Sequence, residues 1–343
     1  MKKTVFLLSY ILLIGNASFS QTAPIYTLAD KIHVEGDGGW DLLAMDESSG
    51  RLFLSHGMVV QVLDVKTKKV VGTIPDTKGV HGIALANDLN KGFTSNGKDT
   101  SVTIFNLKTL SIITKVKVKG VNPDVILYDI FSHRVFVYNG KTSNATVIDG
   151  NSNKVIGTID LPGKPELSVS DGQGQLFVNI EDKSTVCQIN ATTLKVEQTW
   201  PIAPGQEASG LALDIKNHRL FIVCDNKMMV IMNSGNGKVI TSLPIGEGVD
   251  GVVFDPGNKR AYSSNGEGTV TVIQEENENS FKILENVITQ KGARTIAIDT
   301  KTHHIYLPAA EYEPVATGTE EKAHTRPKIK PNTFVVLDIE PLK

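Results

Sequence analysis

The feature that most restricts the fold of this chain is a motif that occurs seven times between Trp40 and Ile339. Each copy contains an apolar run that ends in Asp or Asn, a turn, a strand with an aromatic residue, a polar turn and another apolar strand. The Asp or Asn residues of the copies are Asp46, Asn87, Asp129, Asp171, Asp214, Asp255 and Asp299. Successive copies lie 41, 42, 42, 43, 41 and 44 residues apart, which is typical of a repeat architecture.

Each repeat contains about four segments of strand length, separated by turn residues, as in one blade of a β-propeller. In the first repeat we expect strands at residues 42–45, 51–55, 59–64 and 70–74. The seventh repeat lacks a fourth strand, and residues 25–34 resemble the missing one. The sequence therefore predicts an all-β protein, a seven-bladed β-propeller of four-stranded blades that is closed by the N-terminal strand completing the last blade.

Two sets of recurring residues have structural explanations. An aromatic ring at one position of every second strand predicts packing between blades rather than a stacking platform for a ligand. These rings are Phe53, Phe93, Phe136, Phe177, Phe221, Tyr262 and Tyr306. The third strands end in a side chain that we expect to accept hydrogen bonds from turn amides. These residues are Asp64, Asn106, Asp149, Asn190, Asn233 and Asp338.

Several segments carry a resemblance to a known family. Residues 65–74 and 149–159 resemble the YVTN-type (YncE-like) β-propeller repeat, as do residues 292–299 with 306–311. The YVTN signature is degenerate, as in residues 136–139. The resemblance covers essentially the whole chain after residue 20. It implies seven blades, and it does not imply one agreed activity.

The N-terminal residues predict export. Lys2 and Lys3 precede an apolar stretch at residues 5–14 and small residues before a cleavage site after Ser20. Residues 1–20 thus have the features of a secretory signal peptide, which is too short to span a membrane. We expect residues 21–343 to form a single domain without a membrane span. The mature protein is expected to be a periplasmic or secreted monomer.

Charge and cysteine content exclude several classes of function. Removal of the signal peptide would leave 33 basic and 37 acidic residues, a formal charge of −4. General nucleic-acid binding is not expected, because it depends on many basic residues that neutralise phosphates. Cys187 and Cys224 are the only cysteines, so a disulfide framework does not hold the fold together. The sequence contains no C-x-x-C-H motif, so covalent haem is not expected.

The repeat topology predicts where functional side chains gather. Strand one of an antiparallel blade starts on the face where strand two ends, so two rings of residues should share one channel mouth. The inner ring comprises Asp41, Gly82, Asp124, Glu166, Ser209, Asp250 and Arg294, with Trp40, His81 and Glu207 beside it. The outer ring follows the second strands and includes His56, Asn96, Asn139, Asn179, Glu181, Asp225, Asn265 and Glu311. All except Gly82, Ser209 and Asn179 are candidate ligand-binding residues, although Gly after Asn or His also suits turn formation in the outer ring.

Four carboxylates of the inner ring are also candidate metal ligands. Asp41, Asp124, Glu166 and Asp250 would repel one another by ~1–2 kcal/mol per pair at ~10 Å. Water, Arg294, raised pKa values or a bound divalent cation could offset this repulsion. Oxygen ligands favour Ca²⁺, whereas His56 and His81 would permit Zn²⁺ or another transition metal. A solvated channel and an organic ligand or protein partner remain the alternatives.

These features favour an exported, non-catalytic binding or scaffold propeller that recognises a small ligand, a metal ion or an extracytoplasmic partner. The alternative is a hydrolase of lactone type, in which Arg294 polarises a carbonyl and His81 or Glu166 acts as general base. A long insertion at residues 311–332 of the last repeat would emerge on the same face and form either a functional flap or a surface excursion.

Overall fold

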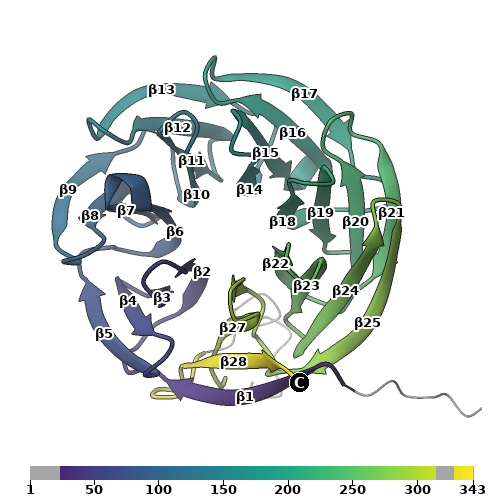
Figure 1. The fold of residues 1–343 in the computed structure, drawn as a ribbon. Coiled ribbons are helices and arrows are strands. Elements are labelled where there is room, and N and C mark those ends of the chain that lie inside the picture. Colours follow the sequence, from purple (N-terminus) through teal and green to yellow (C-terminus); the bar gives the residue numbers. More distant parts are fainter. Residues whose placement is uncertain (1–23, 314–327, 343) are drawn as a thin grey trace, which may run out of the picture.

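The computed structural model describes residues 24–313 and 328–342. These residues form seven four-stranded antiparallel sheets arranged in a ring (Figure 1). The prediction of an all-β propeller with seven blades is therefore confirmed. The proposed signal peptide, residues 1–20, and the middle of the predicted insertion lie outside the described residues.

The first four sheets follow the chain order. Sheet one contains β2 (Trp40–Asp46), β3 (Arg51–His56), β4 (Val59–Asp64) and β5 (Lys69–Ile74). Sheet two contains β6 (Val80–Ala86), β7 (Lys91–Asn96), β8 (Ser101–Asn106) and β9 (Ile112–Lys117). Sheet three contains β10 (Pro123–Asp129), β11 (Arg134–Asn139), β12 (Asn144–Asp149) and β13 (Lys154–Asp160). Sheet four contains β14 (Pro165–Ser170), β15 (Gln175–Ile180), β16 (Thr185–Asn190) and β17 (Lys195–Pro201).

The last sheet joins the two ends of the described chain. Sheet five contains β18 (Ala208–Asp214), β19 (Arg219–Cys224), β20 (Met228–Asn233) and β21 (Val239–Pro244). Sheet six contains β22 (Val249–Asp255), β23 (Arg260–Asn265), β24 (Thr269–Asn277) and β25 (Ser280–Ile288). Sheet seven has β26 (Ala297–Asp299), β27 (His304–Ala309), β28 (Val335–Pro341) and β1 (Tyr26–His33). Strand β1 pairs antiparallel with β28, so the outer strand of this sheet comes from the N-terminal segment.

Helical structure in the described residues is limited to two short 3₁₀ turns, η1 (Asn87–Leu89) and η2 (Glu181–Lys183). Among the same residues, no helix has the length and apolar character needed to cross a membrane. Cys187 and Cys224 are both buried, and each is a free thiol.

The recurring aromatic rings pack between neighbouring blades, as predicted. All seven are at most 3% exposed. Phe221 of β19 stacks on Phe254 of β22 in the next sheet, with ring centroids 5.0 Å apart. Phe93 of β7 likewise stacks on Tyr128 of β10 at 6.5 Å. One ring per blade thus ties each sheet to its neighbour.

The side chains at the ends of the third strands behave as predicted in five blades. Asp64 and Asn190, for example, accept hydrogen bonds from the turn amides of Thr67 and Thr193. The prediction is wrong for Asp338, which lies within β28 because this strand has no hairpin to a fourth strand. Asp338 instead accepts from His304 Nδ1 at 2.7 Å and pairs with Lys68 Nζ at 3.1 Å.

Candidate functional site

The starts of the inner strands surround a polar cavity of about 250 Å³. All seven blades contribute residues to its wall. The lining residues are Asp41, Leu42, His81, Asp124, Val125, Lys164, Glu166, Leu167, Glu181, Ser209, Asp250 and Arg294. We call this cavity the polar mouth. The predicted inner ring therefore lies together, with one correction in the second blade.

That correction concerns the register of the second blade. Val80 pairs with Asn96 just as Trp40 pairs with His56, so His81 is the residue equivalent to Asp41. The sequence predicts Gly82 because Asn87 resembles the Asp that stands at or just after the end of the other inner strands. The structure ends β6 at Ala86, and Asn87 starts the turn η1. The imidazole of His81 thus occupies the ring position expected for Gly82.

His81 lies between two carboxylates. Its Nδ1 is 2.7 Å from Asp41 Oδ2 and 3.6 Å from Asp124 Oδ1. Because a carboxylate only accepts hydrogen bonds, His81 Nδ1 donates to Asp41. Burial raises the pKa of Asp124, and the nearby His81 partly opposes that rise. One potential metal-binding atom from each of Asp41, His81 and Asp124 lies within 4.8 Å of the others.

Arg294 neutralises another part of the polar mouth. Its Nε donates to Asp250 Oδ2 at 2.7 Å, and its Nη2 lies 3.7 Å from Asp41 Oδ1. Burial nevertheless raises the pKa of Asp250 to about 6, because the Arg294 charge offsets only part of the lost hydration. Arg294 is therefore held by carboxylates in this structure.

Lys164 is a member of the polar mouth that sequence reasoning missed. Its Nζ is 2.7 Å from Glu166 Oε1 and also contacts Glu181. Burial raises the pKa of Glu166 to about 7, and Lys164 opposes that rise. The signal was present, because the residue two places before the inner ring is Gly in four blades. The exceptions are Asn122, Lys164 and Glu207.

Several outer-ring candidates do not line the cavity. Asn96, Asn139 and Asn265 are fully buried, because each amide turns back onto the third strand of its own blade. Asn96 Nδ2, for example, donates to Thr103 Oγ1 at 2.9 Å. His56 is 2% exposed, hydrogen bonds Gln61 at 2.6 Å and packs against the ring of Phe334.

The other candidates also lie outside the cavity lining, with Glu181 as the exception. Trp40 is buried against Phe334, with ring centroids 5.6 Å apart. Glu207 and Asp225 are exposed. Glu311, at the start of the insertion, pairs with Lys330 at 2.8 Å. Of the candidate ligand-binding residues, those that line the cavity are Asp41, His81, Asp124, Glu166, Glu181, Asp250 and Arg294. Lys164 also lines it.

The polar mouth carries an excess of acidic groups. Among the described residues that line it, five carboxylates face Lys164, Arg294 and the titratable His81. One imidazole and two carboxylates are donors that suit Zn²⁺ or another transition metal. The same set of acceptors would also suit an organic ammonium group.

Comparison with known proteins supports a distant relationship. No family model matches the chain. Uncharacterized protein YncE of Salmonella typhimurium (strain LT2) is 23% identical over 269 residues, covering 74% of this chain and 75% of the relative. The Salmonella typhi protein of the same name is 22% identical over the same length and coverage.

Solved structures share the fold at low identity. The RRP9 WD40 repeats match with a TM-score of 0.76 and 10% identity, covering 93% of this chain and 99% of that one. U3-55K matches with a TM-score of 0.74 and 11% identity, covering 92% of this chain and 99% of that one. Hydrazine synthase of Kuenenia stuttgartiensis matches with a TM-score of 0.69 and 18% identity, covering 80% of this chain and 94% of that one. The chain is thus a seven-bladed β-propeller with weak homology to YncE.

Proposed function

We propose that this protein is an exported binding propeller that takes a small cationic ligand at the polar mouth. The observation that carries the proposal is the excess of five carboxylates over two permanently charged bases in a cavity of about 250 Å³. The secretory features of residues 1–20 support a periplasmic or secreted location. The propeller fold and the weak homology to YncE support a binding or scaffold role.

The ion pairs inside the polar mouth locate the attractive part of the cavity. Arg294 is bound to Asp250, and Lys164 is shared by Glu166 and Glu181. Asp41, which also lies 3.7 Å from Arg294 Nη2, and Asp124 lie on either side of His81. Carboxylates only accept hydrogen bonds, so a ligand at this side must supply donors or positive charge.

A divalent cation fits these donors. Asp41, His81 and Asp124 would supply two oxygens and one nitrogen, a set that accepts Zn²⁺ and related ions. Binding would displace the His81 proton from the hydrogen bond with Asp41 and would relieve the repulsion between the two carboxylates. The affinity should therefore fall as the pH drops and the ligands become protonated.

Calorimetric titration of the mature protein with Zn²⁺, Mn²⁺, Ca²⁺ and 1,4-diaminobutane tests the proposal. We expect saturable one-to-one binding of at least one of these cations. The variant D41N should weaken it at least ~10-fold, a loss of about 1.4 kcal/mol, whereas the control D225N, an exposed carboxylate outside the cavity, should bind as the wild type does. Absence of binding, or equal loss in D225N, would reject a cation site at the polar mouth.

A lactone-type hydrolase is the second candidate, because the pKa of Glu166 at about 7 suits a general base near neutral pH. Arg294 would polarise the carbonyl of the substrate. A screen of lactones and esters tests this alternative. Turnover that E166Q and R294A both abolish, while D225N retains it, would replace the binding proposal. A wild-type protein without turnover on the panel would leave binding as the better explanation.

A further inference from the structure

The opposite ends of the same inner strands form a second cavity. It has a volume of about 510 Å³ and a wall with aliphatic residues from four consecutive blades. These residues are Leu85, Leu127, Ile130, Val169, Leu213 and Ile215. We call this cavity the apolar mouth. Tyr128 of the apolar mouth lies four positions after Asp124 of the polar mouth along β10, a strand length of about 13 Å.

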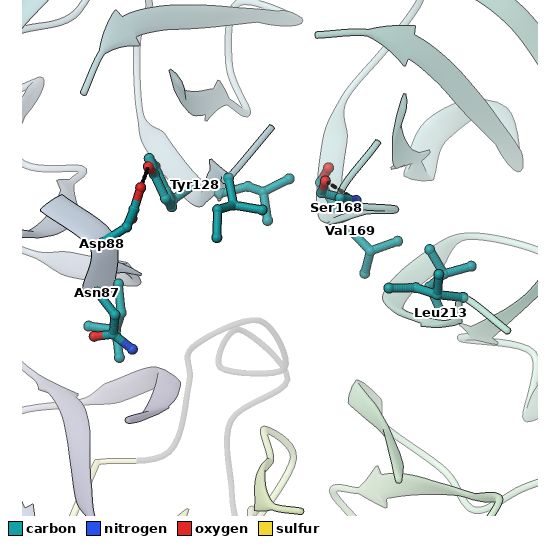
Figure 2. A pocket seen from close by; sticks show the side chains of 12 residues that line it. Asn87, Asp88, Tyr128, Ser168, Val169 and Leu213 are labelled. Carbon is teal, nitrogen blue, oxygen red and sulfur yellow. Dashed lines mark hydrogen bonds between the residues drawn. The ribbon is translucent and has the colours of Figure 1, made fainter. Parts of the chain in front are cut away.

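We propose that the apolar mouth is a second binding site, for a small apolar molecule that carries one amino or hydroxyl donor. The proposal is independent of the cationic ligand at the polar mouth. Figure 2 shows Asn87, Asp88 and Tyr128 on one side of the cavity and Ser168, Val169 and Leu213 on the other. The volume lies within the range of ~300–1,000 Å³ that is usual for small-molecule sites.

The apolar rim is specific to two blades. Ile130 and Ile215 are 59% and 48% exposed, although both line the cavity. They occupy the same place in the turn after β10 and after β18. In the other five blades this place holds Glu47, Asn87, Gly172, Pro256 and Thr300. Turn formation therefore does not require an aliphatic side chain there, whereas contact with an apolar ligand would explain both isoleucines.

One side of the apolar mouth offers a fixed hydrogen-bond acceptor. The Tyr128 hydroxyl donates to Asp88 Oδ2 at 2.8 Å (Figure 2), and the Tyr128 ring is held by its stacking on Phe93. His133 Nδ1 lies 3.0 Å from the same oxygen. Burial and the hydrogen bond to Asp88 raise the pKa of Tyr128, so its hydroxyl remains a donor.

The chemistry of Asp88 determines the polar group of the ligand. A carboxylate has about four acceptor sites and no donor, so Asp88 can accept a further bond only from an amino or hydroxyl group. It would repel an anion. The ligand class is therefore an apolar body with a neutral or cationic donor group, rather than a fatty acid or a sulfonate.

Two fluorescent probes that differ by one group test the inference. N-phenyl-1-naphthylamine carries one N–H donor, and 1-anilinonaphthalene-8-sulfonate adds an anionic group to the same rings. We expect the neutral amine to saturate at one site per chain and to bind at least ~10-fold more tightly than the sulfonate. The variant D88N should reduce this difference, because it removes the negative charge and retains an acceptor.

The double variant I130N/I215N should weaken binding of the neutral amine at least ~10-fold. Both residues are exposed, so an unchanged melting temperature should accompany the loss. The matched control is I288N, since Ile288 is 80% exposed on the outer strand β25, away from the cavity lining. The proposal would be overturned if amine binding did not saturate, if I130N/I215N left it intact, or if I288N weakened it equally.

Sedimentation velocity separates a second copy of the chain from a small ligand as the occupant. Dimers that form in the wild type and are lost in I130N/I215N, together with no saturable amine binding, would assign the surface to self-association and overturn the small-molecule site. A wild type that remains monomeric while it binds the amine supports the proposal.

Discussion

Replacing Glu166 by Gln should make the protein more stable at alkaline pH than the wild type. Glu166 lines the polar mouth with its side chain only 15% exposed, and burial raises its pKa from 4.5 to about 7. Gln has nearly the same shape, carries no charge and can still accept a hydrogen bond from Lys164. Lys164 also keeps Glu181 as a counter-ion.

The pKa values determine the sign and size of this effect. Below pH 4.5 Glu166 is protonated in both the folded and the unfolded chain, so its ionisation does not affect stability. Between pH 4.5 and 7 the unfolded chain loses the proton first, which favours unfolding. Above pH 7 the accumulated loss is about 3 kcal/mol. The wild type should suffer this loss on going from pH 4.5 to 8, and E166Q should not.

Thermal unfolding of both proteins at pH 4.5, 6 and 8 measures the difference. A chain of 343 residues has an unfolding entropy of about 0.7 kcal/mol per kelvin. The melting temperature of E166Q minus that of the wild type should therefore rise by about 4 °C between pH 4.5 and 8. Asp250, whose pKa is also raised, is present in both proteins, so its contribution cancels.

The control for this experiment is E197Q, because Glu197 is exposed on the outer strand β17. E197Q should follow the wild type at every pH. A melting-temperature difference for E166Q that stays constant from pH 4.5 to 8, or one that E197Q reproduces, would show that Glu166 does not have the raised pKa on which the reasoning depends.

Three further predictions concern the fold. F221A should cost about 3–5 kcal/mol, measured by chemical denaturation, because this ring is fully buried between two blades; a loss below ~1 kcal/mol would contradict the packing role. Deleting residues 24–34 should sharply lower the melting temperature, since it removes β1 and exposes the edge of β28; an unchanged melt would refute this. D338N should lower the melting temperature more at pH 6 than at pH 9. Asp338 raises the pKa of His304, so protonated His304 stabilises the folded chain at low pH, and this stabilisation is lost as the pH rises through that pKa. An equal fall in melting temperature at the two pH values would contradict the prediction.

The fold could be predicted from the sequence because each structural signal occurs once per blade. Seven aromatic rings at one spacing support the same packing, so an error in one copy, such as the end of β6 at Ala86, does not change the architecture. The candidate site depends on positions that differ between blades. An error of one residue in the register of the second blade therefore placed Gly82 in the inner ring instead of His81.

Side-chain direction is a second property of the site that the sequence does not determine. Asn96 and Asp124 both lie at the face of the ring that holds the polar mouth, yet Asn96 turns onto Thr103 of its own blade, whereas Asp124 lines the cavity. Residue type and spacing do not distinguish these two directions. Comparison of the repeats could have found Lys164, because it stands where four other blades have Gly.

The raised pKa values of Glu166 and Asp250 bear on why these residues are present. Each ionisable group costs stability near neutral pH, and an amide of the same shape would fill the space without that cost. Packing between blades does not need them, because the buried rings such as Phe53 and Phe136 supply it. Groups with such perturbed pKa values cluster at functional sites. The polar mouth, rather than the regular framework around it, is therefore where ligand binding is to be measured first.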